Sequence, residues 1–334
     1  MPEIRQNLVT REWVIIATER AQRPEDFARK EWTRKVVPEF KSSCPFCPGN
    51  EDQTPPELLR LGEEESWQVR VIPNKFPALS RGGFCERKLE GIKRSMTGVG
   101  IHDVIIETPL HNRTIALLPD EHVEKILQVY KRRYLEVSED PQIEQVVLFK
   151  NHGENAGTSL EHPHSQLIGT PVMPYQVRDR VEAAARYFDD TGECVFCRTL
   201  QDEFQDQKRI IVESYYFIAF IPYAALSPFH IWIYPKNHAA SFGKIQEEEI
   251  KDLAKVLKLI LAKLYYGLED PDFNYVIRSL YKAEVLEYFH WYISIIPRLT
   301  KAAGFELGSG MYINTALPEA SADFLRSVQP PSWA

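Results

Sequence analysis

The sequence predicts an α+β fold that is built from a duplicated unit of roughly 150 residues. Strand-like and helix-like segments are mixed along the 334 residues, and one order of cysteines and histidines occurs twice. Each occurrence has a Cys-x-x-Cys pair and then two distant histidines: Cys44, Cys47, His111 and His162, followed by Cys194, Cys197, His238 and His290. Positions 111 and 162 differ by 51, and positions 238 and 290 differ by 52. We therefore expect two related halves, residues 1–174 and 175–334.

The strands are predicted from short runs that are rich in Val, Ile, Tyr and Trp and bounded by Pro, Asn or Gly. In chain order they are Trp13–Ala17, Val69–Ile72, Asp103–Glu107, Gln145–Lys150, Tyr216–Ile221, His230–Tyr234, Asn274–Arg278 and Trp291–Ile296. A further strand is expected to carry His162 to Gln166, shortly before the junction of the halves near Gly169–Pro174.

Three helices are predicted from apolar residues at helical spacing. They are Glu121–Val137 with Asp120 as its N-cap, Val177–Phe188, and Glu247–Leu264. We expect each of them to be an amphipathic helix that covers a sheet, rather than part of a cofactor site.

The charge and hydropathy of the chain exclude several classes of protein. A formal net charge of −7 argues against a dedicated nucleic-acid or membrane-surface protein, although it leaves room for a local phosphate site. No apolar run approaches the roughly 20 residues that span a bilayer. The first residues, Met1 to Gln6, do not resemble a signal peptide. We expect a cytoplasmic protein with neither nucleic acid nor membrane as its partner.

Each set of two thiols and two imidazoles has the composition of a structural zinc site. The alternative, that the cysteines bind no metal, is weakened because the whole set occurs twice. A redox role would need a thioredoxin-like context, which neither pair shows. His102, His152 and His230 are competing ligands if the expected alignment of the halves is shifted. The sequence thus predicts two zinc sites per chain, with the first better supported than the second.

The segment from His162 to Gln166 follows a loop, residues 151–161, that is rich in glycine, asparagine and hydroxyl residues. Such a loop can bring backbone N–H groups close to a phosphate. Residues two apart on a strand face the same way, so His162, His164 and Gln166 are expected on one face. Because Pro163 cannot donate to a neighbouring strand, the strand should lie at a sheet edge or begin there.

His164 is the predicted nucleophile. A neutral imidazole that is held on a rigid backbone can attack an α-phosphorus and form a nucleotidyl-histidine, from which a second phosphate-bearing acceptor removes the nucleotidyl group. Gln166 can donate to a phosphate oxygen without acting as an acid. The alternative is that His164 is an ordinary polar residue of a sheet. In the second half Tyr292 stands at the corresponding position, so only the first half is expected to be catalytic.

These residues resemble the galactose-1-phosphate uridylyltransferase family of the histidine-triad superfamily. The resemblance covers nearly the whole chain and is most specific at residues 44–50, 151–166 and 304–314. It implies two histidine-triad-like half-domains that form a largely antiparallel sheet flanked by helices. It also implies a ping-pong nucleotidyltransferase that forms homodimers. By resemblance, Asn74, Asn151, Gly157 and Ser159 contact the nucleotide, together with Gln166.

Two departures bear on the substrate. Ser165 occupies a position where the uridylyltransferase motif has glycine, and the second Cys/His set resembles that of an ADP-glucose phosphorylase branch. The first hypothesis is transfer between UDP-glucose and a hexose 1-phosphate. ADP-glucose phosphorolysis and adenylyl transfer from adenylylsulfate to phosphate are alternatives, and a zinc-stabilised nucleotide-binding protein is the non-enzymatic one. Arg298 and Lys301 are either contacts of an acceptor phosphate or surface charges.

Overall fold

A computed structural model describes all residues except 18–22, 29–36, 64–65, 282–285 and 332–334. Its main feature is a ten-stranded sheet in which all neighbouring strands are antiparallel. In spatial order its strands are β10 (Ile210–Glu213), β11 (Phe217–Phe220), β12 (Ile231–Pro235), β14 (Tyr292–Pro297), β13 (Phe273–Arg278), β8 (Gln145–His152), β9 (His164–Thr170), β7 (Ile101–Ile106), β4 (Trp67–Pro73) and β3 (Leu59–Gly62).

The sheet has a duplicated arrangement about the pair β8 and β13. Moving outward from this pair, the first half gives β8, β9 and β7, and the second gives β13, β14 and β12. The partners match as well: Phe149 pairs with Gln166 in one half, and Val276 pairs with Ser294 in the other. The α+β fold from a duplicated unit is confirmed, and one continuous sheet runs through both halves. The expected division at residue 174 stays a prediction.

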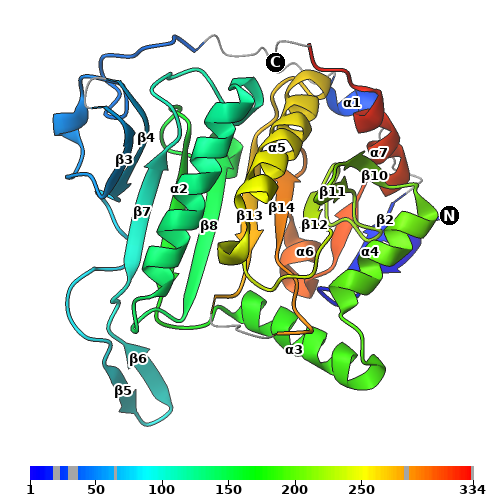
Figure 1. The fold of residues 1–334 in the computed structure, drawn as a ribbon. Coiled ribbons are helices and arrows are strands. Elements are labelled where there is room, and N and C mark those ends of the chain that lie inside the picture. The colour runs from blue at the N-terminus through cyan, green and yellow to red at the C-terminus, as the bar shows by residue number, and fades with distance from the viewer. Residues whose placement is uncertain (18–22, 29–36, 64–65, 282–285, 332–334) are drawn as a thin grey trace.

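Helices α2 (Asp120–Ser138) and α5 (Glu247–Gly267) lie side by side on one face of the sheet (Figure 1). The inner face of α5 includes Ile250, Leu253 and Leu257, which are buried in the largest hydrophobic core. A capping box between Gln246 and Glu249 closes the first turn of this helix. Burial of these apolar faces holds both helices against the sheet.

The opposite face of the second half is covered by α3 (Tyr175–Thr191) and α4 (Val195–Asp206). Val177 of α3 lies beside Val147 and Val276 of the sheet, and Phe196 of α4 packs against Tyr234 and Tyr292. This layer buries in the second half the face that carries His164 in the first half.

The remaining elements lie around this core. A small sheet joins β1 (Glu3–Gln6), β2 (Trp13–Ile16) and β15 (Tyr312–Asn314), and the hairpin of β5 (Arg87–Glu90) and β6 (Lys93–Met96) projects from the body (Figure 1). The short helices are α1 (Pro24–Ala28), α6 (Gly304–Ser309) and α7 (Pro318–Ser327), with 3-10 turns at Glu51–Gln53, Ile115–Leu117, Glu154–Ala156 and Phe242–Lys244. Among the described residues, no helix is both long and apolar enough to cross a bilayer.

Three details differ from the sequence predictions. Asp120 is the first helical residue of α2 rather than its cap, because Pro119 occupies the cap position with an extended backbone. The strand β9 begins at His164, so His162 precedes it; Pro163, which has no N–H, stands just before that start. The second Cys-x-x-Cys pair lies at the start of a further helix, α4, which was not among the three predicted.

Candidate active site

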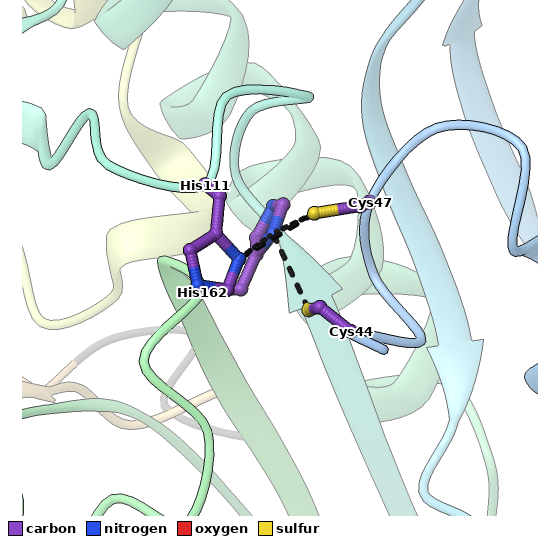
Figure 2. Close-up of side chains that lie close together, drawn as sticks. All are labelled: Cys44, Cys47, His111 and His162. Atoms are coloured by element: carbon purple, nitrogen blue, oxygen red, sulfur yellow. Dashed lines mark hydrogen bonds between the residues drawn. The ribbon is translucent and has the colours of Figure 1, made fainter. Parts of the chain in front are cut away.

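The first Cys/His cluster joins three segments that are far apart in the chain. Cys44 and Cys47 come from a turn, His111 follows β7, and His162 precedes β9; all four are buried. One ligand atom from each lies within 4.8 Å of all the others, and Figure 2 shows the side chains converging on one point.

The separations in this cluster fit a tetrahedral metal. His111 Nδ1 lies 3.3 Å from His162 Nδ1 and 3.4 Å from Cys47 Sγ, and His162 Nδ1 lies 3.7 Å from each sulfur. A zinc ion with Zn–N bonds of about 2.0 Å and Zn–S bonds of about 2.3 Å needs nitrogen and sulfur about 3.5 Å apart. His162 Nε2 donates to the Thr108 carbonyl at 2.8 Å, which leaves Nδ1 free to bind a metal.

The second cluster is less complete. Ligand atoms of Cys194, Cys197 and His238 lie within 4.8 Å of one another. His290 is outside that set, although its Nδ1 lies 3.6 Å from Cys197 Sγ, close to the 3.2 Å between Cys197 Sγ and His238 Nδ1. This cluster is also more open, because His238 is exposed. Both clusters could hold a metal, and neither contains the competing histidines at positions 102, 152 and 230.

His164 is buried at the start of β9, and a single hydrogen bond fixes its ring. Its Nδ1 lies 2.8 Å from the His162 carbonyl, which can only accept. Nδ1 therefore carries the proton, and Nε2 of the neutral ring has a free lone pair. Burial lowers the pKa of His164 below its ordinary value, which favours the neutral ring. The ring packs edge-to-face with Phe46 of the Cys-x-x-Cys turn.

Gln166 faces the same side of the sheet and is oriented by His102. The Ala78 N–H donates to His102 Nδ1 at 3.1 Å, so the ring proton is on Nε2, which donates to Gln166 Oε1 at 2.8 Å. The NH2 group of Gln166 is thus turned away from His102. Asn74 lies close to this group, with its Nδ2 3.1 Å from His102 Nε2, but both atoms carry hydrogens and the contact is not a hydrogen bond. Sequence reasoning considered His102 only as a metal ligand.

The loop that follows β8 lies beside His164. Because Phe149 pairs with Gln166, Asn151 is placed next to His164 on the same face. Gly157 takes a φ of +86° after the 3-10 turn, and Ser159 follows it; both are exposed. This arrangement brings Asn151 to the expected site, and it places Gly157 and Ser159 on the exposed part of the same loop.

Asp272, a residue of the second half, is hydrogen-bonded to this loop. Asp272 Oδ2 accepts from the backbone N–H of Asn155 at 2.6 Å and from its side chain at 2.8 Å. Gly153 has a φ of +84°, and a Cβ there would lie 1.8 Å from Asp272 Oδ1. Glycine is therefore required at position 153 for this contact.

A buried polar network lies beneath His164, on the face that packs against α2. Glu107 lies 2.5 Å from the Lys150 ammonium and 2.5 Å from the Ser165 hydroxyl, and Tyr130 donates to it at 2.7 Å. The Tyr275 hydroxyl lies 2.6 Å from that of Tyr130. Burial opposes ionisation of Glu107, but Lys150 and the hydroxyl donors outweigh it and lower the pKa of this carboxyl. Sequence reasoning missed the network, since its members lie on four elements, α2, β8, β9 and β13, and at Glu107 just after β7.

The corresponding face of the second half has a different chemistry. Tyr292, the counterpart of His164, lies among Trp232, Tyr234 and Phe196 with ring centroids 4.9 to 6.0 Å away. Ser294 corresponds to Gln166. The sequence put Tyr292 in place of the nucleophile, and the structure places aromatic side chains around it.

Comparison with known proteins gives the family. The N-terminal domain of galactose-1-phosphate uridyl transferase matches residues 1–174, and its C-terminal domain matches residues 180–302. The chain belongs to the galactose-1-phosphate uridyl transferase family. It is 38% identical to an ADP-glucose phosphorylase of Arabidopsis thaliana over 98% of this chain and 93% of that protein. A galactose-1-phosphate uridylyltransferase of Thermotoga maritima is 28% identical over 98% and 99% of the two chains.

Solved structures agree with this assignment. The Arabidopsis thaliana ADP-glucose phosphorylase with bound ADP-glucose superposes with a TM-score of 0.83 at 35% identity, covering 98% of this chain and 99% of that one. A uridylyltransferase structure gives a TM-score of 0.76 at 26% identity, covering 98% of each. Because these relatives are nucleotidyltransferases, the chain is an enzyme of that class, and the family resemblance seen in the sequence is confirmed.

Proposed function

We propose that the chain transfers a nucleotidyl group from a nucleotide sugar to a phosphate-bearing acceptor by a ping-pong mechanism through His164. The free lone pair on Nε2 supports this role. Nε2 attacks the α-phosphorus, a P–N bond forms, and the P–O bond to the leaving sugar 1-phosphate breaks with its electron pair on oxygen. An acceptor phosphate oxygen then attacks the same phosphorus, the P–N bond breaks, and the lone pair returns to Nε2.

The other site residues would hold the transferred phosphate and the nucleotide. The NH2 group of Gln166 is turned away from His102 and would donate to a phosphate oxygen. Asn74, Asn151, Gly157 and Ser159 would contact the nucleotide. Transfer of this kind depends mainly on position and on charge stabilisation.

We propose zinc for both clusters. The thiol and imidazole ligands and the near-tetrahedral separations of the first cluster support this choice. Cys44, Cys47, His111 and His162 would hold one ion, and Cys194, Cys197, His238 and His290 a second after a small shift of His290. Zinc would supply rigidity to the backbone of His162, whose carbonyl oxygen fixes the His164 ring.

ADP-glucose as donor and inorganic phosphate as acceptor are the substrates best supported by similarity. The Arabidopsis phosphorylase resembles this chain in sequence and structure more than the Thermotoga or uridylyltransferase examples do. This reverses the order of the sequence-based hypotheses, which put UDP-glucose and a hexose 1-phosphate first. UDP-glucose stays the second candidate because both domains of the uridyl transferase family match. A cytoplasmic homodimer is the form we propose for the enzyme.

Covalent labelling tests the proposal. The protein is incubated with ADP-glucose, UDP-glucose or adenylylsulfate, each labelled at the α-phosphorus, and the label on the chain is counted after denaturation. We expect one nucleotidyl group per chain from ADP-glucose, released as ADP by phosphate. Labelling from UDP-glucose instead, with release as UDP-galactose by galactose 1-phosphate, would support the second candidate.

Two variants provide the controls. His164→Ala should abolish labelling while its metal content and circular dichroism stay unchanged. Tyr292→Phe alters the counterpart of His164 in the second half and should be labelled like the wild type. If no donor labels the wild-type chain, the enzymatic proposal is wrong and a zinc-stabilised nucleotide-binding protein becomes the better description.

A further inference from the structure

The side-chain amide of Asn274 on β13 makes three hydrogen bonds. Its Nδ2 donates to Asn151 Oδ1 and to the Ala156 carbonyl, each at 2.8 Å, and its Oδ1 accepts from Arg298 Nε at 2.5 Å. Asn274 and Arg298 belong to the second half, whereas Asn151 and Ala156 belong to the first. These bonds join the nucleophile-free half to the loop beside His164.

Arg298 and the Ala156 carbonyl together determine which way round the Asn274 amide lies. A guanidinium group has only donors, so Asn274 must turn its oxygen toward it. Its NH2 group then faces Asn151, which must present its own oxygen in return. The Nδ2 of Asn151 is consequently turned away from Asn274 and is available as a donor to a ligand.

The amide of Gln166 is oriented in the same sense by a different neighbour. His102 donates to Gln166 Oε1 and so turns the NH2 group of Gln166 away from itself. Both amides lie on the face of the sheet that carries His164. The oxygens of an ionised phosphate diester or of a pyrophosphate only accept hydrogen bonds, so two amides held as donors complement such a group.

We propose that Asn274 and Arg298 are positioning residues that fix Asn151 as a hydrogen-bond donor to the nucleotidyl phosphate. This inference rests on the proposed function, because it takes that phosphate as the ligand of Asn151. The second half, which has no nucleophile of its own, thereby has a role in catalysis. A residue on one of its strands fixes the direction in which the Asn151 amide of the first half donates.

The hydrogen bonds from Arg298 through Asn274 to Asn151 are called the relay below. Asn274→Asp tests this relay with almost no change in the shape of the side chain. The ionised carboxylate that this variant carries accepts from Arg298 but cannot donate, so it loses the bond to the Ala156 carbonyl. Asn151 must then turn its NH2 group toward position 274 and its oxygen toward the phosphate. We expect single-turnover labelling of His164 by ADP-glucose to slow by about 10- to 100-fold, the usual effect of losing a donor to a charged group. Binding of AMP should weaken by a similar factor, whereas binding of adenosine, which has no phosphate, should not change.

Variants at Arg298 and Asn151 distinguish an effect on the orientation of the Asn151 amide from a general disturbance of the loop. Arg298→Lys keeps a donor-only side chain and should retain most of the labelling rate, whereas Arg298→Glu, which can only accept, should lower it. Asn274→Asp should add little to the loss caused by Asn151→Ala, because its effect passes through Asn151. If the losses instead multiply, or if adenosine and AMP weaken equally, the relay is wrong and the residues only support the loop.

The result is separable from that of the proposed function. If the wild-type chain accepts no label from ADP-glucose, the same comparison is made with UDP-glucose, UMP and uridine. If neither donor labels it, the proposed function fails, and the relay fails with it. If the wild type is labelled and Asn274→Asp is labelled at the same rate, only the relay is overturned.

Discussion

The Lys150 ammonium lies 2.5 Å from the Glu107 carboxylate, and both side chains are fully buried in the sheet beneath His164. Removing two charges from water is costly, so such a pair persists only where further hydrogen bonds satisfy both groups. Ser165 and Tyr130 donate to the carboxylate, and Lys150 also donates to the His164 carbonyl at 3.3 Å. The ion pair is therefore directly connected to the backbone of the proposed nucleophile.

Removing one partner of this pair should destabilise the protein strongly. Glu107→Gln leaves the Lys150 charge buried and unpaired, and a change of this kind costs about 3–5 kcal/mol. Lys150→Met should cost a similar amount. The double variant should lose much less than the sum, since neither charge is left behind. Denaturant unfolding of the metal-loaded proteins measures all three, and strictly additive losses would contradict the proposed coupling.

The Ser165 hydroxyl should contribute to this network in a measurable way. Ser165→Ala removes one donor to Glu107, for which we expect a loss of about 1–3 kcal/mol in unfolding free energy. Ser165→Gly should cost about 0.5–1 kcal/mol more, because glycine is unfavourable within a strand. Ser95→Ala on the exposed hairpin is the matched control and should change stability by less than about 0.5 kcal/mol. Equal stability of the variants at position 165 and the control would show that the hydroxyl does not matter.

The duplication and the first Cys/His cluster could be predicted because each depends on the order and type of residues along the chain. The matching intervals between the histidines can be read from the sequence without knowledge of side-chain contacts. The register of β8 with β9 agrees with the duplication that these intervals predict. The alternation of a strand also placed His164 and Gln166 on one face correctly. The predicted strand was too long at its start, because β9 begins at His164, directly after Pro163, which has no N–H.

The supporting contacts could not be predicted in the same way. Lys150 on β8 and Glu107, just after β7, come from opposite sides of β9, and that strand order is a property of the assembled sheet. Asn274 lies on a strand that also contains Arg278, and its proposed role depends on a partner 123 positions away. For Gln166, the neighbour that sets its amide is His102, which the sequence suggested only as a spare metal ligand.

The two metal clusters should have separable effects. Cys47→Ser should remove one equivalent of zinc and also slow the labelling of His164, because the carbonyl that orients its ring belongs to the proposed metal ligand His162. Cys194→Ser should remove one equivalent and lower thermal stability without slowing labelling. Elemental analysis after dialysis, with the labelling rate, measures both. Cys85→Ala is the matched control, since Cys85 lies outside both clusters.

Two results would contradict the prediction for the first cluster. Full zinc content in Cys47→Ser would show that the first cluster does not require this thiol. Unchanged labelling after loss of the first metal would show that the ion does not hold the His162 backbone in place.

His230 should make stability depend on pH. It is buried between the strands of the second half, and burial, with smaller repulsion from Arg278 and Arg180, lowers its pKa to about 3. In the unfolded chain its pKa returns to about 6.5. Between these values the unfolded state binds one more proton than the folded state, so this group's contribution to stability is lost as the pH falls below 6.5.

We expect the stability of His230→Gln, which does not titrate at this position, to decline less steeply with falling pH, by up to about 1.4 kcal/mol per pH unit. Unfolding free energies at pH 7, 6 and 5 compare the two proteins with both metal clusters intact, so their difference isolates His230. Parallel curves would mean that His230 does not set the acid limit of the fold.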